Sequence, residues 1–230
     1  MIEYVVPGNI DDRILGRAAR KLEEGGLVSM PTDSSWIAAC SFKSREGIKK
    51  LKSISGERDE RHFTLLCTDI AQFGELCSLD NTRFRLIKRL SPGPYVFILK
   101  TLLGTEKALG LRRREIGVRI PNHDVPLSLI KTLGYPLYSV TAKRSMIRGA
   151  DGDDIYDGAY RNEDGHTEND SLPPIPEEEL FEGGWEIEEI DGIDTILDPG
   201  EDQTRTFSTI LDLSGDEVSV VRQGAGLWPV

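Results

Sequence analysis

A cluster of hydroxyl and carboxylate side chains, Thr32, Asp33 and Ser34, follows a short apolar run at residues 27–30. The run is typical of a buried strand, and the proline after it is expected to end that strand because it has no N–H to donate. Ligands of open α/β sheets bind outside the carboxyl ends of strands. The cluster, backed by the ring of Trp36, therefore predicts a site for a small polar ligand. The alternative is a turn in which Asp33 and Ser34 bond their own backbone.

Two arginines associated with other apolar runs are candidate anion ligands. Arg119 lies within residues 117–120, and Arg222 follows residues 218–221. Guanidinium groups bind phosphate or carboxylate oxygens through paired N–H groups, although a surface ion pair explains either arginine equally well. Taken by themselves, His62 and His123 fit partly exposed structural roles. The sequence has no P-loop, G-x-G-x-x-G or H-x-x-x-H motif, so it gives no support to zinc hydrolysis or ordinary NTPase chemistry.

Charge is distributed unevenly along the 230 residues, whose net charge is -11. Residues 151–202 contain 20 Asp or Glu and one basic residue, a net of -19. The remainder of the chain holds 19 acids and 27 bases, a net of +8. Such a basic body suits anionic ligands such as ATP or RNA, whereas the acidic part repels them or occupies their site.

No apolar run approaches the ~20 residues that a membrane span needs, and the N-terminus has no signal-peptide pattern. The three cysteines, Cys40, Cys67 and Cys77, form no C-x-x-C pair. We therefore expect core cysteines in a cytoplasmic protein, and neither a disulfide framework nor a metal site.

Alternating strand and helix patterns predict an α/β fold, a twisted mixed sheet with flanking helices, formed by residues 1–230 as a single domain. Residues 149–194 are predicted to be an acidic, partly flexible insertion within it. Its apolar residues are expected to dock on the body: Leu180, Phe181, Trp185, Ile187 and Ile190. Asn9 is the expected N-cap of the first helix. In the helix over residues 81–90, the sequence predicts that Phe84, Ile87 and Leu90 face the core.

Several segments, in order, resemble the YrdC/YciO-like family, which comprises the threonylcarbamoyl-AMP synthases and their relatives. They are residues 31–34, 62–67, 91–95, 117–123, 139–141, 208–212 and 222–224. The sequence at residues 63–65 and 80–81 is most similar to the YciO branch of the family. The resemblance implies the YrdC-like fold.

The resemblance also implies a nucleotidyltransferase of tRNA modification. Such synthases join L-threonine, bicarbonate and ATP, with Mg²⁺ accompanying the ATP as substrate, and release pyrophosphate. Carried over position by position, the substrate-binding residues are Thr32, Ser34, Arg119 and His62. The nucleotide-binding residues are Arg58, Arg61, Ser139, Thr141, Lys143, Ser208 and Arg222. No catalytic residue and no metal ligand is assigned.

Two departures from the synthase pattern favour weak or altered activity. The synthases carry Lys-x-Arg where this chain has Ser53 and Ser55, so two phosphate-facing cations are missing unless Arg58 and Arg61 replace them. A synthase asparagine is replaced by Lys143, which offers donors but no acceptor.

A third departure lies in the turn itself, where Ser35 and Trp36 replace a glycine and a tyrosine and are expected to narrow the pocket. Three hypotheses remain open: a weak threonylcarbamoyl-AMP synthase, an RNA- or nucleotide-binding module without robust catalysis, and an acidic insertion that docks a partner or masks the cleft. The substrate and the oligomeric state are not determined by the sequence.

Overall fold

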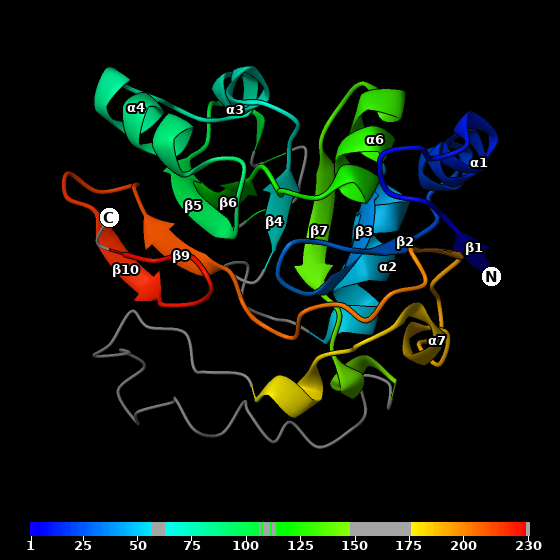
Figure 1. The fold of residues 1–230 in the computed structure, drawn as a ribbon. Helices are drawn as coiled ribbons and strands as arrows, with labels where there is room; N and C mark the ends of the chain where they lie inside the picture. Colours follow the sequence, from blue (N-terminus) through cyan, green and yellow to red (C-terminus); the bar gives the residue numbers. More distant parts are fainter. Residues whose placement is uncertain (57–62, 106, 108–110, 112–113, 148–175, 229–230) are drawn as a thin grey trace, which may run out of the picture.

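Ten strands form one mixed sheet, in the order β1-β8-β2-β3-β7-β4-β6-β5-β9-β10 (Figure 1). The computed structural model describes residues 1–56, 63–105, 107, 111, 114–147 and 176–228. The pairs β1–β8, β8–β2, β4–β6 and β5–β9 are parallel, and the remaining neighbours are antiparallel. The twisted mixed sheet predicted from the sequence is therefore correct. β8, from late in the chain, lies between the two early strands β1 and β2.

The strands correspond to the apolar runs of the sequence within a few residues. They are β1 (Ile2–Tyr4), β2 (Val28–Pro31), β3 (Trp36–Ser41), β4 (Thr64–Leu66), β5 (Tyr95–Lys100), β6 (Glu115–Arg119), β7 (Leu137–Thr141), β8 (Thr195–Asp198), β9 (Thr209–Asp212) and β10 (Ser219–Arg222). β2 ends at Pro31, as expected, but includes this residue, which is paired with Trp36. The central strand β3 is buried along its whole length, as expected where helices cover both faces of a sheet.

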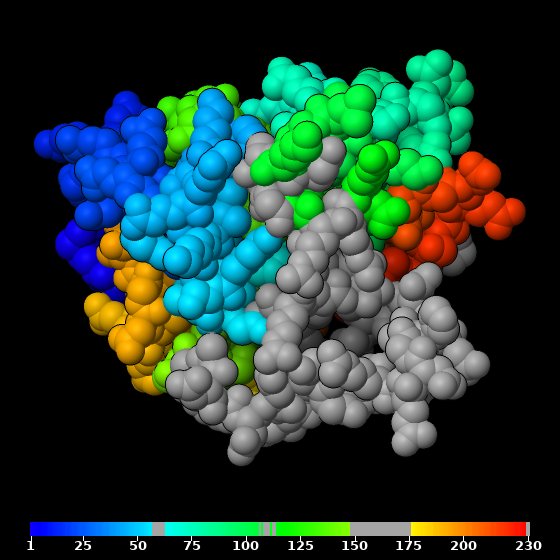
Figure 2. Space-filling model, turned by 180° about the vertical axis from the view of Figure 1, so that it is seen from behind, coloured from blue at the N-terminus to red at the C-terminus, as the bar shows by residue number. Residues whose placement is uncertain are grey.

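Helices cover both faces of the sheet. α1 (Asp12–Glu23) and α6 (Asp124–Leu133) share a hydrophobic cluster with the sheet face that carries Ile37 and Ala39. The opposite face, which carries Ala38 and Cys40, shares a larger cluster with α2 (Arg45–Ser55), α3 (Ile70–Leu76), α4 (Asn81–Leu90) and α7 (Gly184–Ile187). Figure 2 shows α2, in light blue, on this second face. Within the described residues, no helix combines the length and apolar character required to cross a bilayer.

The N-cap of α1 is Asp11, not Asn9 as the sequence suggested. The Asp11 carboxylate accepts a hydrogen bond from the backbone N–H of Arg13 at 2.8 Å. Asn9 lies too early, because it belongs to a turn before the helix, in which its N–H donates to the carbonyl of Val6. The helix then buries Leu15, Ala18, Ala19 and Leu22, whose spacing of three and four residues places them on one side.

Two apolar residues are more exposed than the sequence predicts. Phe84 is 40% exposed, because only the second half of α4, with Ile87 and Leu90, is buried. Trp185 is 64% exposed. It precedes the buried Ile187 of α7 by two positions, which places the two side chains on opposite sides of a helix. The other predicted docking residues, Leu180, Phe181, Ile187 and Ile190, are buried as expected. Residues 149–175 of the predicted insertion lie outside the described residues.

Candidate functional site

The turn between β2 and β3 is held by the hydroxyl of Thr32. Its Oγ1 donates to the carbonyl of Ser35 at 2.8 Å and accepts from the N–H groups of Ser34 and Ser35 at 3.2 and 3.3 Å. The turn therefore does bond its own backbone, but through Thr32 rather than through Asp33 or Ser34. With the Thr32 hydroxyl committed and buried, Asp33 and Ser34 are the side chains that the turn presents to other segments.

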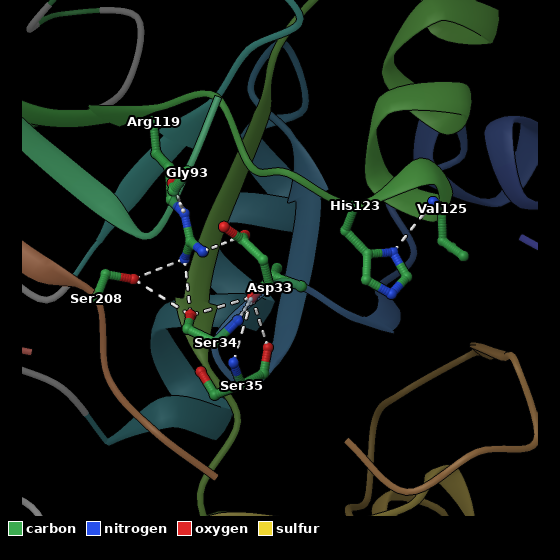
Figure 3. A network of polar contacts seen from close by, with 9 residues as sticks. Asp33, Ser34, Ser35, Gly93, Arg119, His123, Val125 and Ser208 are labelled. Atoms are coloured by element: carbon green, nitrogen blue, oxygen red, sulfur yellow. Dashed lines mark hydrogen bonds and ion pairs between the residues drawn. The ribbon is translucent and has the colours of Figure 1, made fainter. Parts of the chain in front are cut away.

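A single buried guanidinium, that of Arg119, joins four segments of the chain (Figure 3). Its Nη1 donates to the hydroxyls of Ser34 and Ser208 at 3.0 and 2.7 Å, and its Nη2 forms a 2.5 Å ion pair with Asp33 Oδ1. Its Nε donates to the carbonyl of Gly93 at 3.3 Å. Because Arg119 is only 4% exposed, these contacts replace nearly all of its hydration.

These residues come together, but not because the carboxyl ends of their strands lie at the same edge of the sheet. The pairings from β2 through β3, β7 and β4 to β6 make β2 and β6 run in opposite directions, so their carboxyl ends lie at opposite ends of the sheet. Instead, the β2–β3 hairpin reaches across the sheet (Figure 1). There it contacts the segment that enters β9, where Thr206 N–H donates to the carbonyl of Ser34 at 3.1 Å. The long Arg119 side chain spans the remaining gap (Figure 3).

Asp33 has one oxygen that the network leaves unused. Its Oδ2 is buried and accepts no hydrogen bond from any of the described residues. Burial lowers the pKa of Arg119, and the Asp33 carboxylate opposes that shift. Because an arginine stays protonated near neutral pH, the pair remains an ion pair with a spare acceptor. A buried acceptor without a partner is costly, and a ligand N–H or O–H satisfies it.

Arg222 is a second cation beside this pair. Its Nε and Nη2 donate to the carbonyl of Ser208 at 3.2 and 3.1 Å, and its Cζ lies 4.8 Å from the ring centroid of Phe207. Burial, together with the nearby Arg119 charge, lowers the pKa of Arg222 to about 10. Within the described part of the chain Arg222 has no ion-pair partner. The Arg222 guanidinium is therefore fixed in position by Ser208, and its charge is available to an anion.

His123 lies at the start of α6 and faces the same cluster (Figure 3). Its Nδ1 accepts a hydrogen bond from the N–H of Val125 at 3.2 Å and so caps the helix. Burial lowers the pKa of His123, although Asp33 and Asp124 act to raise it. The imidazole is thus neutral at pH 7, and because Nδ1 is an acceptor, its proton is on Nε2.

The predicted nucleotide-binding residues of β7 lie on the sheet face that α1 and α6 cover, but they are not part of the Arg119 network. Ser139 and Thr141 are paired with Ala39 and Ile37, and paired residues project to the same face. The Ser139 hydroxyl is buried and donates to the carbonyl of Thr64 at 2.9 Å. Lys143, half-buried, precedes the short 3₁₀ helix η2 (Arg144–Met146).

Three predicted residues, Arg58, Arg61 and His62, lie outside the described residues. Conversely, Asp33 and Gly93 are part of the network although neither was among the predicted site residues. Asp33 stood in the polar cluster that first marked the turn, and its spacing gave no sign of a partner 86 residues away. Gly93 contributes only a carbonyl, for which a sequence carries no signal.

Comparisons with known proteins agree with this architecture. The Sua5/YciO/YrdC family model, described as "Telomere recombination", matches residues 20–151. YciO of Escherichia coli K12 is 29% identical over 97% of this chain and 95% of its own length. A threonylcarbamoyl-AMP synthase of Chromobacterium violaceum is 27% identical over 61% of this chain and 72% of its own.

Two solved structures share the fold. The crystal structure of E. coli YciO superposes with a TM-score of 0.76 at 25% identity, covering 100% of this chain and 98% of that one. P. abyssi Sua5 complexed with L-threonine gives 0.74 at 21% identity, covering 97% of this chain and 57% of that one. Because the family model matches more than half of the chain, the protein belongs to the Sua5/YciO/YrdC family, to which threonylcarbamoyl-AMP synthases are related.

Proposed function

We propose that the protein binds ATP, L-threonine and bicarbonate and slowly forms threonylcarbamoyl-AMP. In this reaction the threonine nitrogen is carboxylated, and the resulting carboxylate attacks the α-phosphorus of ATP and releases pyrophosphate. Two observations carry this proposal. Arg222 has no ion-pair partner among the described residues and shares Ser208 with Arg119. Asp33, the ion-pair partner of Arg119, keeps one unsatisfied oxygen. The carboxylate of an amino acid can bind the Arg222 guanidinium. Its ammonium or hydroxyl group can donate a hydrogen bond to the Asp33 carboxylate. ATP contributes further anionic oxygens to the same region.

The chain's own residues act by binding and orientation. Arg222 stabilises anionic oxygens, Arg119 holds Asp33, Ser34 and Ser208 in place, and the turn held by Thr32 fixes the position of Asp33. A buried, preorganised set of charges supplies such stabilisation without reorganisation during the reaction. Mg²⁺ enters with the ATP as part of the substrate, because it neutralises the phosphate oxygens of the nucleotide.

The reaction is proposed to be slow because α2 has serines at the two positions where the synthases carry Lys-x-Arg. Ser53 and Ser55 lie in the last turn of α2, where Ser55 is buried and donates to the carbonyl of Lys52 at 3.2 Å. A charge-assisted contact to phosphate contributes roughly 1.5–3 kcal/mol. Losing two such contacts lowers the rate by on the order of 10²- to 10⁴-fold, since each 1.36 kcal/mol is about tenfold.

Calorimetric titration with ATP·Mg²⁺ and with L-threonine tests binding, and pyrophosphate release tests turnover. We expect Asp33→Asn to weaken threonine binding more than ATP binding, because Asp33 accepts from the amino acid. We expect Arg222→Gln to weaken the binding of both ligands, because both offer anionic oxygens to Arg222. Arg13→Gln, which alters an exposed arginine of α1, is the matched control. Absence of threonine and ATP binding by the wild-type protein contradicts the proposal. Synthase-like turnover contradicts only the part that concerns rate.

A second candidate, an RNA- or nucleotide-binding module without robust catalysis, is favoured by the two serines at the end of α2. Binding of ATP or RNA without pyrophosphate release supports it. RNA binding by the basic body must weaken steeply as salt rises, because neutralised phosphates release counterions. The buried free thiols of Cys40, Cys67 and Cys77 support a reducing compartment, and we propose the cytoplasm.

A further inference from the structure

The segment 177–190 contains η3 (Glu177–Glu179) and α7, and it buries four apolar side chains against the body. One side chain of the body, Arg144, also makes several polar contacts with it. The Nε of Arg144 donates to the carbonyl of Glu178 at 2.9 Å, and Nη2 forms an ion pair with Glu186. The Cζ of Arg144 lies 5.2 Å from the ring centroid of the fully buried Phe181. One guanidinium thus contacts three points of the segment.

Glu186 is the inner partner of this anchor. Its side chain is 7% exposed and also accepts hydrogen bonds from the N–H groups of Glu182, at 2.7 Å, and Gly183, at 3.5 Å. Burial acts to raise the pKa of Glu186, but the Glu182 N–H and the Arg144 guanidinium outweigh it, so the pKa lies below its usual value. The carboxylate is therefore charged at neutral pH and fixes the turn before α7.

The fixed turn contacts the parts of the chain that carry the candidate site. The carbonyl of Glu182 accepts from Trp36 Nε1 at 3.2 Å and from Gln203 N–H at 2.8 Å. Trp36 follows the β2–β3 turn directly and is fully buried. Its own carbonyl accepts from Ala142 N–H at 3.0 Å, which ties the end of β7 to the hairpin.

A second link runs from the same turn toward Ser208. The Glu182 carboxylate forms a 2.8 Å ion pair with Arg205. One residue later, Thr206 N–H donates to the carbonyl of Ser34. The 177–190 segment is therefore connected to the hairpin that presents Asp33 and Ser34 and to the strand entry that presents Ser208.

We propose that Arg144 is a positioning residue for the site, acting through the 177–190 segment. By fixing Glu182, Arg144 sets the position of Trp36 on one side and of residues 203–206 on the other. The separation of Ser34 from Ser208, both ligands of the Arg119 guanidinium, then depends on an anchor that touches neither. The consequence for ATP and threonine affinity rests on the proposed function, whereas the coupling between segments does not.

Amide hydrogen exchange on the full chain tests the coupling without any ligand. We expect Arg144→Ala to speed exchange at Gln203 and Thr206 by about tenfold or more, because their local opening becomes easier. Amides of the β5–β6 pair, which take no part in the hydrogen bonds and ion pairs described above for the segment, are expected to exchange at wild-type rates. Arg144→Lys keeps the charge without the planar fork, so it should restore part of the protection.

Two further variants complete the experiment. Arg13→Ala, which removes an exposed ion pair with Asp11, should leave exchange at Gln203 and Thr206 unchanged. Glu186→Gln removes the charge from the inner partner while keeping an acceptor, and it takes the place of Arg144→Ala if that variant does not fold. Unchanged exchange at Thr206 in the folded variant overturns the proposal.

Affinity is measured in the same variants by calorimetry with ATP·Mg²⁺ and with L-threonine. We expect Arg144→Ala to bind both more weakly and Arg144→Lys to recover part of the loss. If the wild-type protein binds neither ligand, the proposed function fails while faster exchange at Thr206 still supports the role of Arg144. If exchange accelerates but affinity stays at the wild-type value, the positioning role is refuted.

Discussion

The ion pair between Asp33 and Arg119 can be tested by removing either partner. The side chains are 14% and 5% exposed, so the pair is almost entirely shielded from water. Removing one partner of a buried pair typically costs 3–5 kcal/mol of unfolding free energy, because the other charge is left uncompensated. Arg119 keeps its hydrogen bonds to Ser34, Ser208 and Gly93 in the Asp33→Ala variant. We therefore expect this variant to lose ~3 kcal/mol of unfolding free energy, at the lower end of that range.

A double-mutant cycle separates the pair from the rest of the network. Arg119→Met leaves the Asp33 carboxylate buried without its cation, whereas Arg119→Met with Asp33→Ala removes both charges. If the interaction is what stabilises the turn, the double variant loses less than the sum of the single losses. We expect a coupling free energy on the order of 2 kcal/mol.

Urea unfolding at neutral pH measures these free energies, and thermal unfolding provides a second readout. A loss of ~3 kcal/mol corresponds to a Tm lower by roughly 6–12 °C for a chain of this size. Arg13→Ala, which breaks the exposed pair with Asp11 but leaves the Asp11 N-cap of α1 in place, is the control and should cost about 1 kcal/mol or less. A loss below ~1 kcal/mol for Asp33→Ala, or additive losses in the cycle, refutes the reasoning.

Three further predictions concern single residues around the site. Because burial lowers the pKa of His123 below its ordinary 6.5, the unfolded chain binds more protons in that window and the unfolding free energy rises with pH there; His123→Asn, which keeps a capping acceptor, should remove that slope in urea titrations between about pH 5 and 7. A Cβ on Gly224 would overlap the backbone of Phe207 and Ser208, so Gly224→Ala should cost at least ~1–3 kcal/mol in thermal unfolding; wild-type stability in this variant contradicts the packing. Trp36→Phe keeps a buried ring but loses the indole donor, so it should cost about 1–3 kcal/mol, measured against Trp185→Phe on the surface.

Local pattern predicted the elements better than their contacts. Apolar runs identified the ten strands of the described residues because most of them are buried over several consecutive residues, a property that a sequence displays directly; β1 and β10, at the edges of the sheet, are the exceptions. Capping was harder, since Asn9 and Asp11 are both good N-cap residues and only the preceding turn decides between them. Trp185 was misplaced because an apolar side chain in a four-residue helix carries no periodicity from which its direction follows.

The candidate site was predictable only in part. The turn at residues 32–34 is visible as a polar cluster after an apolar run, and resemblance pointed to Arg119, Ser208 and Arg222. Their association depends on the hairpin crossing the sheet, which no local pattern encodes. The bond from Trp36 to Glu182 joins residues 146 positions apart. Such contacts follow from the topology of the whole sheet rather than from either segment.

The position of β8 between β1 and β2 has a consequence for synthesis on the ribosome. β1 and β2 emerge early, yet neither can pair with β8 until residues 195–198 have been translated. Until then each leaves backbone N–H and C=O groups open to pairing with other chains. Ser208 and Arg222 emerge later still, so every growing chain passes through a long interval in which the β2–β3 hairpin exists and these two members of the candidate site do not. Proteins dominated by such distant pairings fold slowly and are exposed to aggregation while they wait, which makes the interval before residue 195 the period when a chaperone would matter most.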